Sequence, residues 1–198
     1  MNRITWHWSA GTHKVSKLDR RHYHFAIDGN GVIHKGDHRP EDNLDTSTPY
    51  AAHTRGANTG NIGIALCAMH GAKESPFDPG KYPITNKQVD ALVKLTAELC
   101  DTYRISVTPR TVLSHAEWQP TNGVKQRGKW DISWLPGMNG PGNPVTVGTG
   151  LRKRVLAEMQ GKIPGMPNVQ PIRRKGFWAN LVLLIRGIVA ALTGIGRK

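Results

Sequence analysis

Near its amino terminus the chain reads ITWHWS over residues 4–9. The apolar side chains of Ile4, Trp6 and Trp8 alternate with polar ones, and this period of two predicts a β-strand. In such a strand His7 points to the face opposite the two tryptophans. The segment therefore predicts a strand that buries one face in the core and presents a histidine on the other.

Four further strands are predicted from short apolar or alternating runs at 23–27, 32–35, 61–69 and 111–114. The first two flank the sequence DGNG at 28–31, which is a strong signal for a β-hairpin. Residues 36–60 are rich in Gly, Pro, Asn, Asp and Thr. Connections of that length inside a compact domain are usually functional, so we expect a long, functional surface loop there.

The strongest helix signal begins at Thr85. Thr85 and Gln88 have the spacing of a capping box, and apolar residues follow at helical intervals, which predicts a helix at about 86–103. A second, weaker helix is predicted near 150–161, and the stretch at 119–150 is turn-rich. Together these elements predict an α/β fold, in which helices flank a central mixed β-sheet.

The positive charge of the chain is unevenly distributed. The 27 Lys and Arg residues against 14 Asp and Glu give a net charge of +13. Residues 1–150 carry 17 basic and 13 acidic residues, whereas residues 151–198 carry 10 basic residues and one acidic residue. Basic proteins are attracted to nucleic acids, anionic lipids or acidic polymers. Because residues 1–150 are only mildly basic and contain no nucleic-acid-binding motif, no nucleic-acid partner is expected.

The last part of the chain differs from the rest in composition. Prolines interrupt residues 163–176, which predicts a basic linker, and residues 177–198 predict a cationic apolar helix. Arg186 offsets most of the favourable insertion energy of the apolar residues around it. A helix that spans a membrane, one that lies on its surface and one that docks on the body therefore all stay open. Such a segment is attracted to anionic membranes or lipopolysaccharide.

The two cysteines and the first residues of the chain allow two further predictions, one about thiol pairing and one about the site of synthesis. Cys67 lies in an apolar run and Cys100 on an apolar helical face, which favours two buried free thiols over a disulfide. The first residues lack the pattern of a signal peptide, so we expect synthesis in the cytoplasm and a separate route to any site of action outside it. We expect a monomer.

Three residues have features that a zinc site needs. His7 lies in the first strand, His115 follows the strand at 111–114, and Asp131 ends the sequence GKWD at 128–131. Two imidazoles and a carboxylate leave a tetrahedral zinc ion one open position for water, as hydrolytic sites require. From spacing alone, a structural role for the strand histidine is the simpler interpretation.

Five short motifs occur in a fixed order along the chain. They are ITWHWSAG at 4–11, YHF at 23–25, HTRG at 53–56 with NIGI at 61–64, SHAE at 114–117 and GKWD at 128–131. In this order they resemble the zinc-dependent N-acetylmuramoyl-L-alanine amidases of the phage-lysozyme and peptidoglycan-recognition superfamily. The resemblance spans about residues 3–137. It implies a zinc amidase domain at 1–150, followed by a terminal helix of the body at 151–162.

The resemblance also implies a role for each matching residue. The zinc ligands it implies are His7, His115 and Asp131. Tyr23 matches the tyrosine that contacts the water on the metal, and Lys129 matches the lysine that stabilises the tetrahedral intermediate. His53 matches a histidine on the wall of the substrate cleft.

The chain departs from the family pattern in two places that concern the site. The third ligand is Asp131, whereas some phage members have a cysteine there, and a carboxylate suits zinc equally well. Residues 119–127 are an insertion relative to compact relatives, and they lengthen the interval between His115 and Asp131. Glu117 is a further acid that could support a ligand, ranked below Lys129.

The function that this resemblance implies is hydrolysis of the amide bond between N-acetylmuramic acid and L-alanine in peptidoglycan, as in a phage endolysin that acts on the cell wall. Two alternatives stay open. One is a recognition module that binds peptidoglycan without cutting it, and the other is a membrane-permeabilising protein that acts mainly through its tail. The complete ligand set, with Tyr23 and Lys129, favours the enzyme, because non-catalytic relatives usually lack a zinc ligand.

Overall fold

A five-stranded mixed sheet in the order β3-β2-β4-β1-β5 forms the centre of the computed structural model, which describes residues 1–161. Its strands are β1 (Arg3–Trp8), β2 (Phe25–Ile27), β3 (Ile33–Lys35), β4 (Asn61–Leu66) and β5 (Val112–Ser114). Strand β1 runs parallel to β4 and β5, β2 runs parallel to β4, and β3 pairs antiparallel with β2. All five predicted strands and the hairpin are confirmed. The linker predicted at 163–176 and the helix predicted at 177–198 lie outside the described residues.

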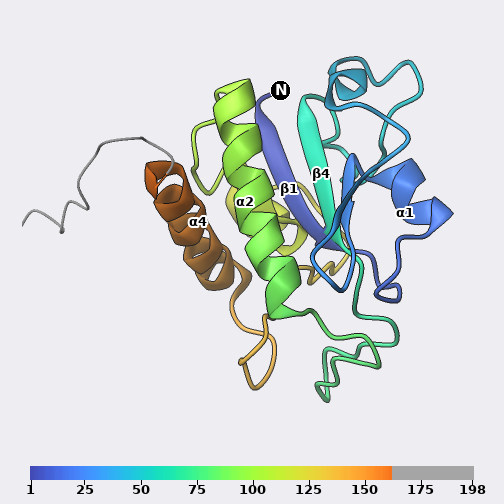
Figure 1. The fold of residues 1–198 in the computed structure, drawn as a ribbon, viewed down its shortest axis with the longest axis vertical. Coiled ribbons are helices and arrows are strands. Elements are labelled where there is room, and N and C mark those ends of the chain that lie inside the picture. Colours follow the sequence, from blue (N-terminus) through green and yellow to red (C-terminus); the bar gives the residue numbers. More distant parts are fainter. Residues whose placement is uncertain (162–198) are drawn as a thin grey trace, which may run out of the picture. The chain divides into compact units, whose positions relative to one another are not determined.

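Helix α2 (Asn86–Tyr103) covers one face of the sheet, and Figure 1 shows it running alongside β1, with β4 on the far side of β1. The helix begins with the predicted capping box. The Thr85 hydroxyl accepts a hydrogen bond from the backbone N–H of Gln88 at 3.2 Å, and the Gln88 side-chain oxygen accepts one from the backbone N–H of Thr85 at 3.0 Å. The indole N–H of Trp6 donates to Thr96 Oγ1 on α2 at 3.0 Å. The tryptophan face of β1 is therefore the face that packs against this helix.

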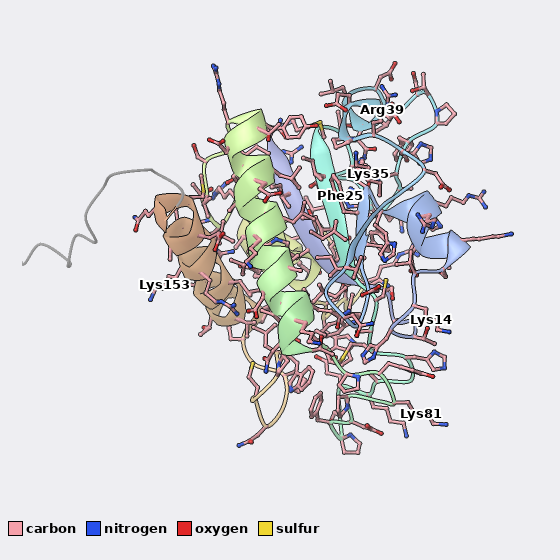
Figure 2. All side chains as sticks on the ribbon, viewed as in Figure 1. Lys14, Phe25, Lys35, Arg39, Lys81 and Lys153 are labelled. Carbon is pink, nitrogen blue, oxygen red and sulfur yellow. The ribbon has the colours of Figure 1, made fainter. Side chains whose placement is uncertain are left out.

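Helix α4 (Pro144–Gly161) packs beside α2 and begins earlier than the sequence analysis placed it. The predicted start near residue 150 is wrong. The side-chain oxygen of Asn143 accepts the N–H groups of Val145 and Thr146 at 3.0 and 3.2 Å, and a proline takes the first helical position. Both are standard helix-start signals. Lys153 on this helix extends away from the ribbon in Figure 2, as Lys14 and Lys81 do elsewhere.

Short elements and loops cover the opposite face of the sheet. They are α1 (Lys17–His22), the 3₁₀ turns η1 (Pro40–Leu44) and η2 (His115–Glu117), and α3 (Trp118–Asn122). On this face Thr5 Oγ1 accepts the indole N–H of Trp118 at 3.0 Å. His7, two residues further along β1, lies on the same face, as predicted.

Two further observations concern the cysteines and the apolar character of the helices. Cys67 and Cys100 are buried free thiols, as expected. Within residues 1–161 no helix has both the length and the apolar character needed to cross a membrane.

Candidate metal centre

The carboxyl ends of two parallel strands bring the candidate ligands together. His7 lies near the end of β1, and His115 follows the last residue of β5, its parallel neighbour. Asp131 reaches the same edge from a loop, and its backbone carbonyl accepts the N–H of Ala116 at 2.6 Å. This edge is where open α/β sheets usually form their sites.

Three side-chain atoms form a small triangle at this edge. His7 Nδ1 lies 3.0 Å from His115 Nδ1 and 3.1 Å from Asp131 Oδ2, and the last two atoms are 3.2 Å apart. All three residues are buried. A tetrahedral zinc ion with bonds of about 2.0 Å would separate its ligand atoms by about 3.3 Å. The triangle therefore has the size expected of three protein ligands around one ion with a fourth position open.

His53 fixes which nitrogen of His7 faces the triangle. His53 Nε2 lies 3.2 Å from the carbonyl oxygen of Asn61, which can only accept, so this nitrogen carries the proton and Nδ1 does not. His7 Nε2 lies 3.2 Å from that unprotonated Nδ1 and donates to it. In neutral His7 the lone pair is then on Nδ1, directed at the other two ligand atoms.

His115 is oriented in the same manner from the other side. Its Nε2 lies 2.9 Å from Oε1 of Gln126, which accepts a hydrogen bond and leaves His115 Nδ1 without a proton. Both imidazoles thus present the nitrogen that a metal requires.

The electrostatics of the triangle favour a bound cation. Burial lowers the pKa of His7 to about 4. Burial acts to raise the pKa of Asp131, but the neighbouring His115 and His7 outweigh it and bring that pKa to about 2. At neutral pH the lone pair of His7 therefore faces the negative charge of Asp131, and a positive ion between them would relieve their repulsion. Nitrogen and oxygen ligands in this number fit zinc.

Tyr23 flanks the triangle at the junction between α1 and β2. Its ring centroid lies 5.1 Å from that of His7, and the side chain is half-buried. Burial raises the pKa of the Tyr23 hydroxyl above its ordinary value, so the group stays protonated and can donate a hydrogen bond.

A cavity of about 400 Å³ opens beside the triangle and is lined by His115, His53 and Lys129. Its cationic lining residues are Arg55, Lys125, Arg127 and Lys129. In the part of the chain that the structure describes, no acidic side chain lines it. The structure thus brings the sequence-predicted residues to one place: three form the triangle, Tyr23 and His53 contact His7, and Lys129 lies exposed on the cavity wall.

Two residues have roles that differ from the sequence analysis. Gln126, buried against His115, was not singled out, because the turn-rich stretch around it carries no periodic signal. Glu117 does not support a metal ligand through its side chain. Its carboxylate accepts the N–H of Ser114 at 2.8 Å and pairs with Arg152 of α4 at 2.8 Å.

Comparison with known proteins places the chain in a family. A sequence profile described as N-acetylmuramoyl-L-alanine amidase matches residues 1–137, and no curated protein matches the chain by sequence. Similar solved structures include the amidase LysC from Clostridium intestinale URNW, at 19% identity over 75% of this chain and 85% of that one, with a TM-score of 0.43.

Two further structures are the Ph2119 endolysin from the Thermus scotoductus MAT2119 bacteriophage Ph2119 and the amidase AmiD from E. coli. The first is 17% identical over 59% of this chain and 71% of that one, with a TM-score of 0.40. AmiD, solved with anhydro-N-acetylmuramic acid-L-Ala-D-gamma-Glu-L-Lys, is 21% identical over 59% and 48%, also with a TM-score of 0.40. The profile match covers most of the chain and includes all three residues of the triangle, and the chain belongs to the N-acetylmuramoyl-L-alanine amidase family, enzymes that act on peptidoglycan.

Proposed function

We propose that this amidase is a zinc-dependent endolysin that hydrolyses the bond between the lactyl group of N-acetylmuramic acid and L-alanine. One observation carries the proposal: three buried ligand atoms converge within 3.2 Å beside an open cavity. In this proposal His7, His115 and Asp131 hold one zinc ion. When bound, zinc supplies Lewis-acid activation of the amide carbonyl and of the attacking water.

Tyr23 and Lys129 supply the protein's own part of the chemistry. The protonated hydroxyl of Tyr23, beside His7, can orient the attacking water by a hydrogen bond. The ammonium group of Lys129, on the cavity wall, would stabilise the negative charge that develops on the carbonyl oxygen of the scissile amide. His53 holds His7 in the orientation that these steps require.

The cavity suits a negatively charged substrate. Stem peptides of peptidoglycan carry free carboxylates, and four cationic side chains line this cavity. Positively charged clefts with low-dielectric walls concentrate anionic ligands. We infer that Arg55, Lys125 and Arg127 bind the stem peptide, while the triangle faces the sugar-linked amide.

The direct test is release of new L-alanine amino termini from purified peptidoglycan. The wild-type protein is expected to release them, to lose this activity in a chelator and to recover it with added zinc. Asp131→Ala should abolish the release, whereas Asp90→Ala, which removes an exposed carboxylate on α2, should leave it unchanged. Equal release by the Asp131→Ala protein would overturn the proposal. Binding to cell walls with no new termini would instead identify a recognition module.

We further propose that residues 163–198 draw the enzyme to anionic membranes or lipopolysaccharide, and that the protein is made in the host cytoplasm and acts at the cell wall. The support is the sequence alone, since this segment is both apolar and strongly basic. The full chain should bind phosphatidylglycerol vesicles and ignore phosphatidylcholine ones, and a chain ending at Lys162 should bind neither. Equal binding to anionic vesicles by the two chains would contradict a role for the tail.

A further inference from the structure

The turn-rich segment 119–127 contributes a buried side chain beside the metal triangle. Gln126 is only 5% exposed. Its Oε1 lies 2.9 Å from Nε2 of His115, and its Nε2 lies 3.0 Å from the backbone carbonyl oxygen of Arg55. One amide thus joins a candidate metal ligand to the backbone of Arg55, another residue that lines the cavity.

The contact with Arg55 fixes the orientation of the amide. A backbone carbonyl only accepts hydrogen bonds, so the nitrogen of the Gln126 amide must face Arg55 and the oxygen must face His115. An amide oxygen in turn only accepts, so His115 must carry its proton on Nε2. In the neutral ring of His115, the chain of bonds that begins at the Arg55 carbonyl therefore leaves Nδ1 without a proton.

The backbone of Gln126 reaches a second residue of the site. Its carbonyl oxygen accepts the N–H of Lys129 at 3.2 Å, which holds the turn that carries this lysine. Gln126 therefore contacts the imidazole of His115 through its side chain and the Lys129 turn through its main chain. Gln126 also lines the cavity beside the triangle, but it supplies none of the three ligand atoms.

We propose that Gln126 is a positioning residue that sets the tautomer and ring orientation of His115 and thereby raises the affinity of the site for zinc. The inference rests on the proposed zinc site. Hydrogen-bond partners of metal-ligating histidines typically change metal affinity 10- to 100-fold when they are removed.

The test measures zinc affinity by competition with a chromophoric chelator, together with the tautomer of His115 by ¹⁵N NMR of the zinc-free protein. Gln126→Met keeps the length of the side chain and removes both hydrogen bonds, so affinity should fall about 10- to 100-fold. Gln160→Met makes the same substitution at an exposed position of α4, away from the site, and should change affinity less than about twofold. Gln126→Glu keeps an acceptor for His115 but loses the donor to the Arg55 carbonyl, so its affinity should lie between those of Gln126→Met and the wild type.

Each outcome separates this inference from the proposed function. If the wild-type protein binds zinc and Gln126→Met binds it equally well, the positioning role is wrong while the zinc site stands. If the wild-type protein binds no zinc, the proposed function fails first. The wild-type NMR spectrum needs no variant that might misfold: for the neutral ring of His115, the tautomer with its proton on Nε2 supports the inference, and the tautomer with its proton on Nδ1 overturns it.

Discussion

The metal triangle is assembled from two halves that are held by different forces. His7, with Tyr23 and His53 around it, forms the sheet half of the site. His115 and Asp131, with Gln126 behind them, form the loop half. His7 belongs to a six-residue strand that is hydrogen-bonded on both sides, to β4 and to β5. In the loop half His115 follows the end of β5, whereas Asp131 and Gln126 come from loops and are held by a few polar contacts.

Because the two halves are held differently, different substitutions should disturb their geometry. In the sheet half, backbone pairing and close packing set the geometry, so added volume is the main threat. In the loop half, single buried hydrogen bonds and one ion pair set the geometry, so loss of one partner is the main threat. The predictions below test the two halves with these different changes.

The largest effect is expected from the ion pair that anchors the loop half. Arg152 of α4 pairs with Glu117, two residues after His115, and both side chains are buried, at 5% and 0% exposure. Arg152→Met leaves a buried carboxylate without its counter-ion, with only the Ser114 N–H still bonded to it, and should lower the free energy of unfolding by about 3–5 kcal/mol. Urea unfolding in excess chelator measures this without a metal contribution.

A neighbouring pair on the same helix gives the control. Arg154 pairs with Asp90 at 2.7 Å, but these side chains are 48% and 60% exposed. Arg154→Met should cost less than about 1 kcal/mol. The double variant Glu117→Gln with Arg152→Met should recover much of the loss, and equal costs for the Arg152 and Arg154 variants would refute this account of the loop half.

The stability of the sheet half should depend on pH through the buried residue His24. This residue accepts the N–H of Gly63 at 2.9 Å and donates from Nε2 to Asn43 at 3.0 Å. Burial lowers its pKa from 6.5 to about 4. Between these values the unfolded chain binds a proton that the folded one does not, so stability is fully present above about pH 6.5 and is lost as the pH falls toward 4.

The part due to His24 amounts to about 3 kcal/mol between pH 7 and pH 4. Urea unfolding of the zinc-free wild type and of His24→Gln at both pH values isolates it, because glutamine can make both hydrogen bonds but does not titrate. An equally steep loss in the glutamine variant would show that His24 contributes nothing to the acid sensitivity.

A smaller effect is expected from added volume in the sheet half. A Cβ atom at Gly63 of β4 would lie 2.6 Å from the ring of His53, which is itself hydrogen-bonded to His7 and to Asn61. Gly63→Ala should therefore destabilise the protein by about 1–3 kcal/mol and weaken zinc binding through His7. Thermal and urea unfolding, with a zinc titration, would measure both.

Gly150→Ala on α4 is the matched control. Nothing lies within 4 Å of a Cβ atom at that position, so alanine should stabilise the helix by about 0.5–1 kcal/mol and leave zinc binding unchanged. If alanine at Gly63 is tolerated as well as alanine at Gly150, close packing does not hold the sheet half.

The two halves also differ in how well sequence reasoning reached them. The alternation around His7 and the capping box at Thr85 are local patterns, and both predicted their elements closely. The start of α4 had a local signal in Asn143 and Pro144 that was not used. Gln126 had none, because its role depends on Arg55, 71 positions earlier in the chain. Contacts of that kind follow from tertiary structure and leave no period in the sequence.

The three ligands were within reach of sequence reasoning only through the ordered motifs. His7 and Asp131 are 124 positions apart, and spacing alone does not connect them. The parallel pairing of β1 with β5 supplies the missing link, because it places the ends of both strands at one edge of the sheet.

The zinc content of the purified protein tests the central claim most directly. Wild-type protein, metallated and then dialysed, should retain one zinc ion per chain by elemental analysis. His115→Ala and Asp131→Ala should retain almost none while staying folded by circular dichroism, and Asp90→Ala should match the wild type. A folded His115→Ala protein that retains as much zinc as the wild type would contradict the assignment of the metal to this triangle.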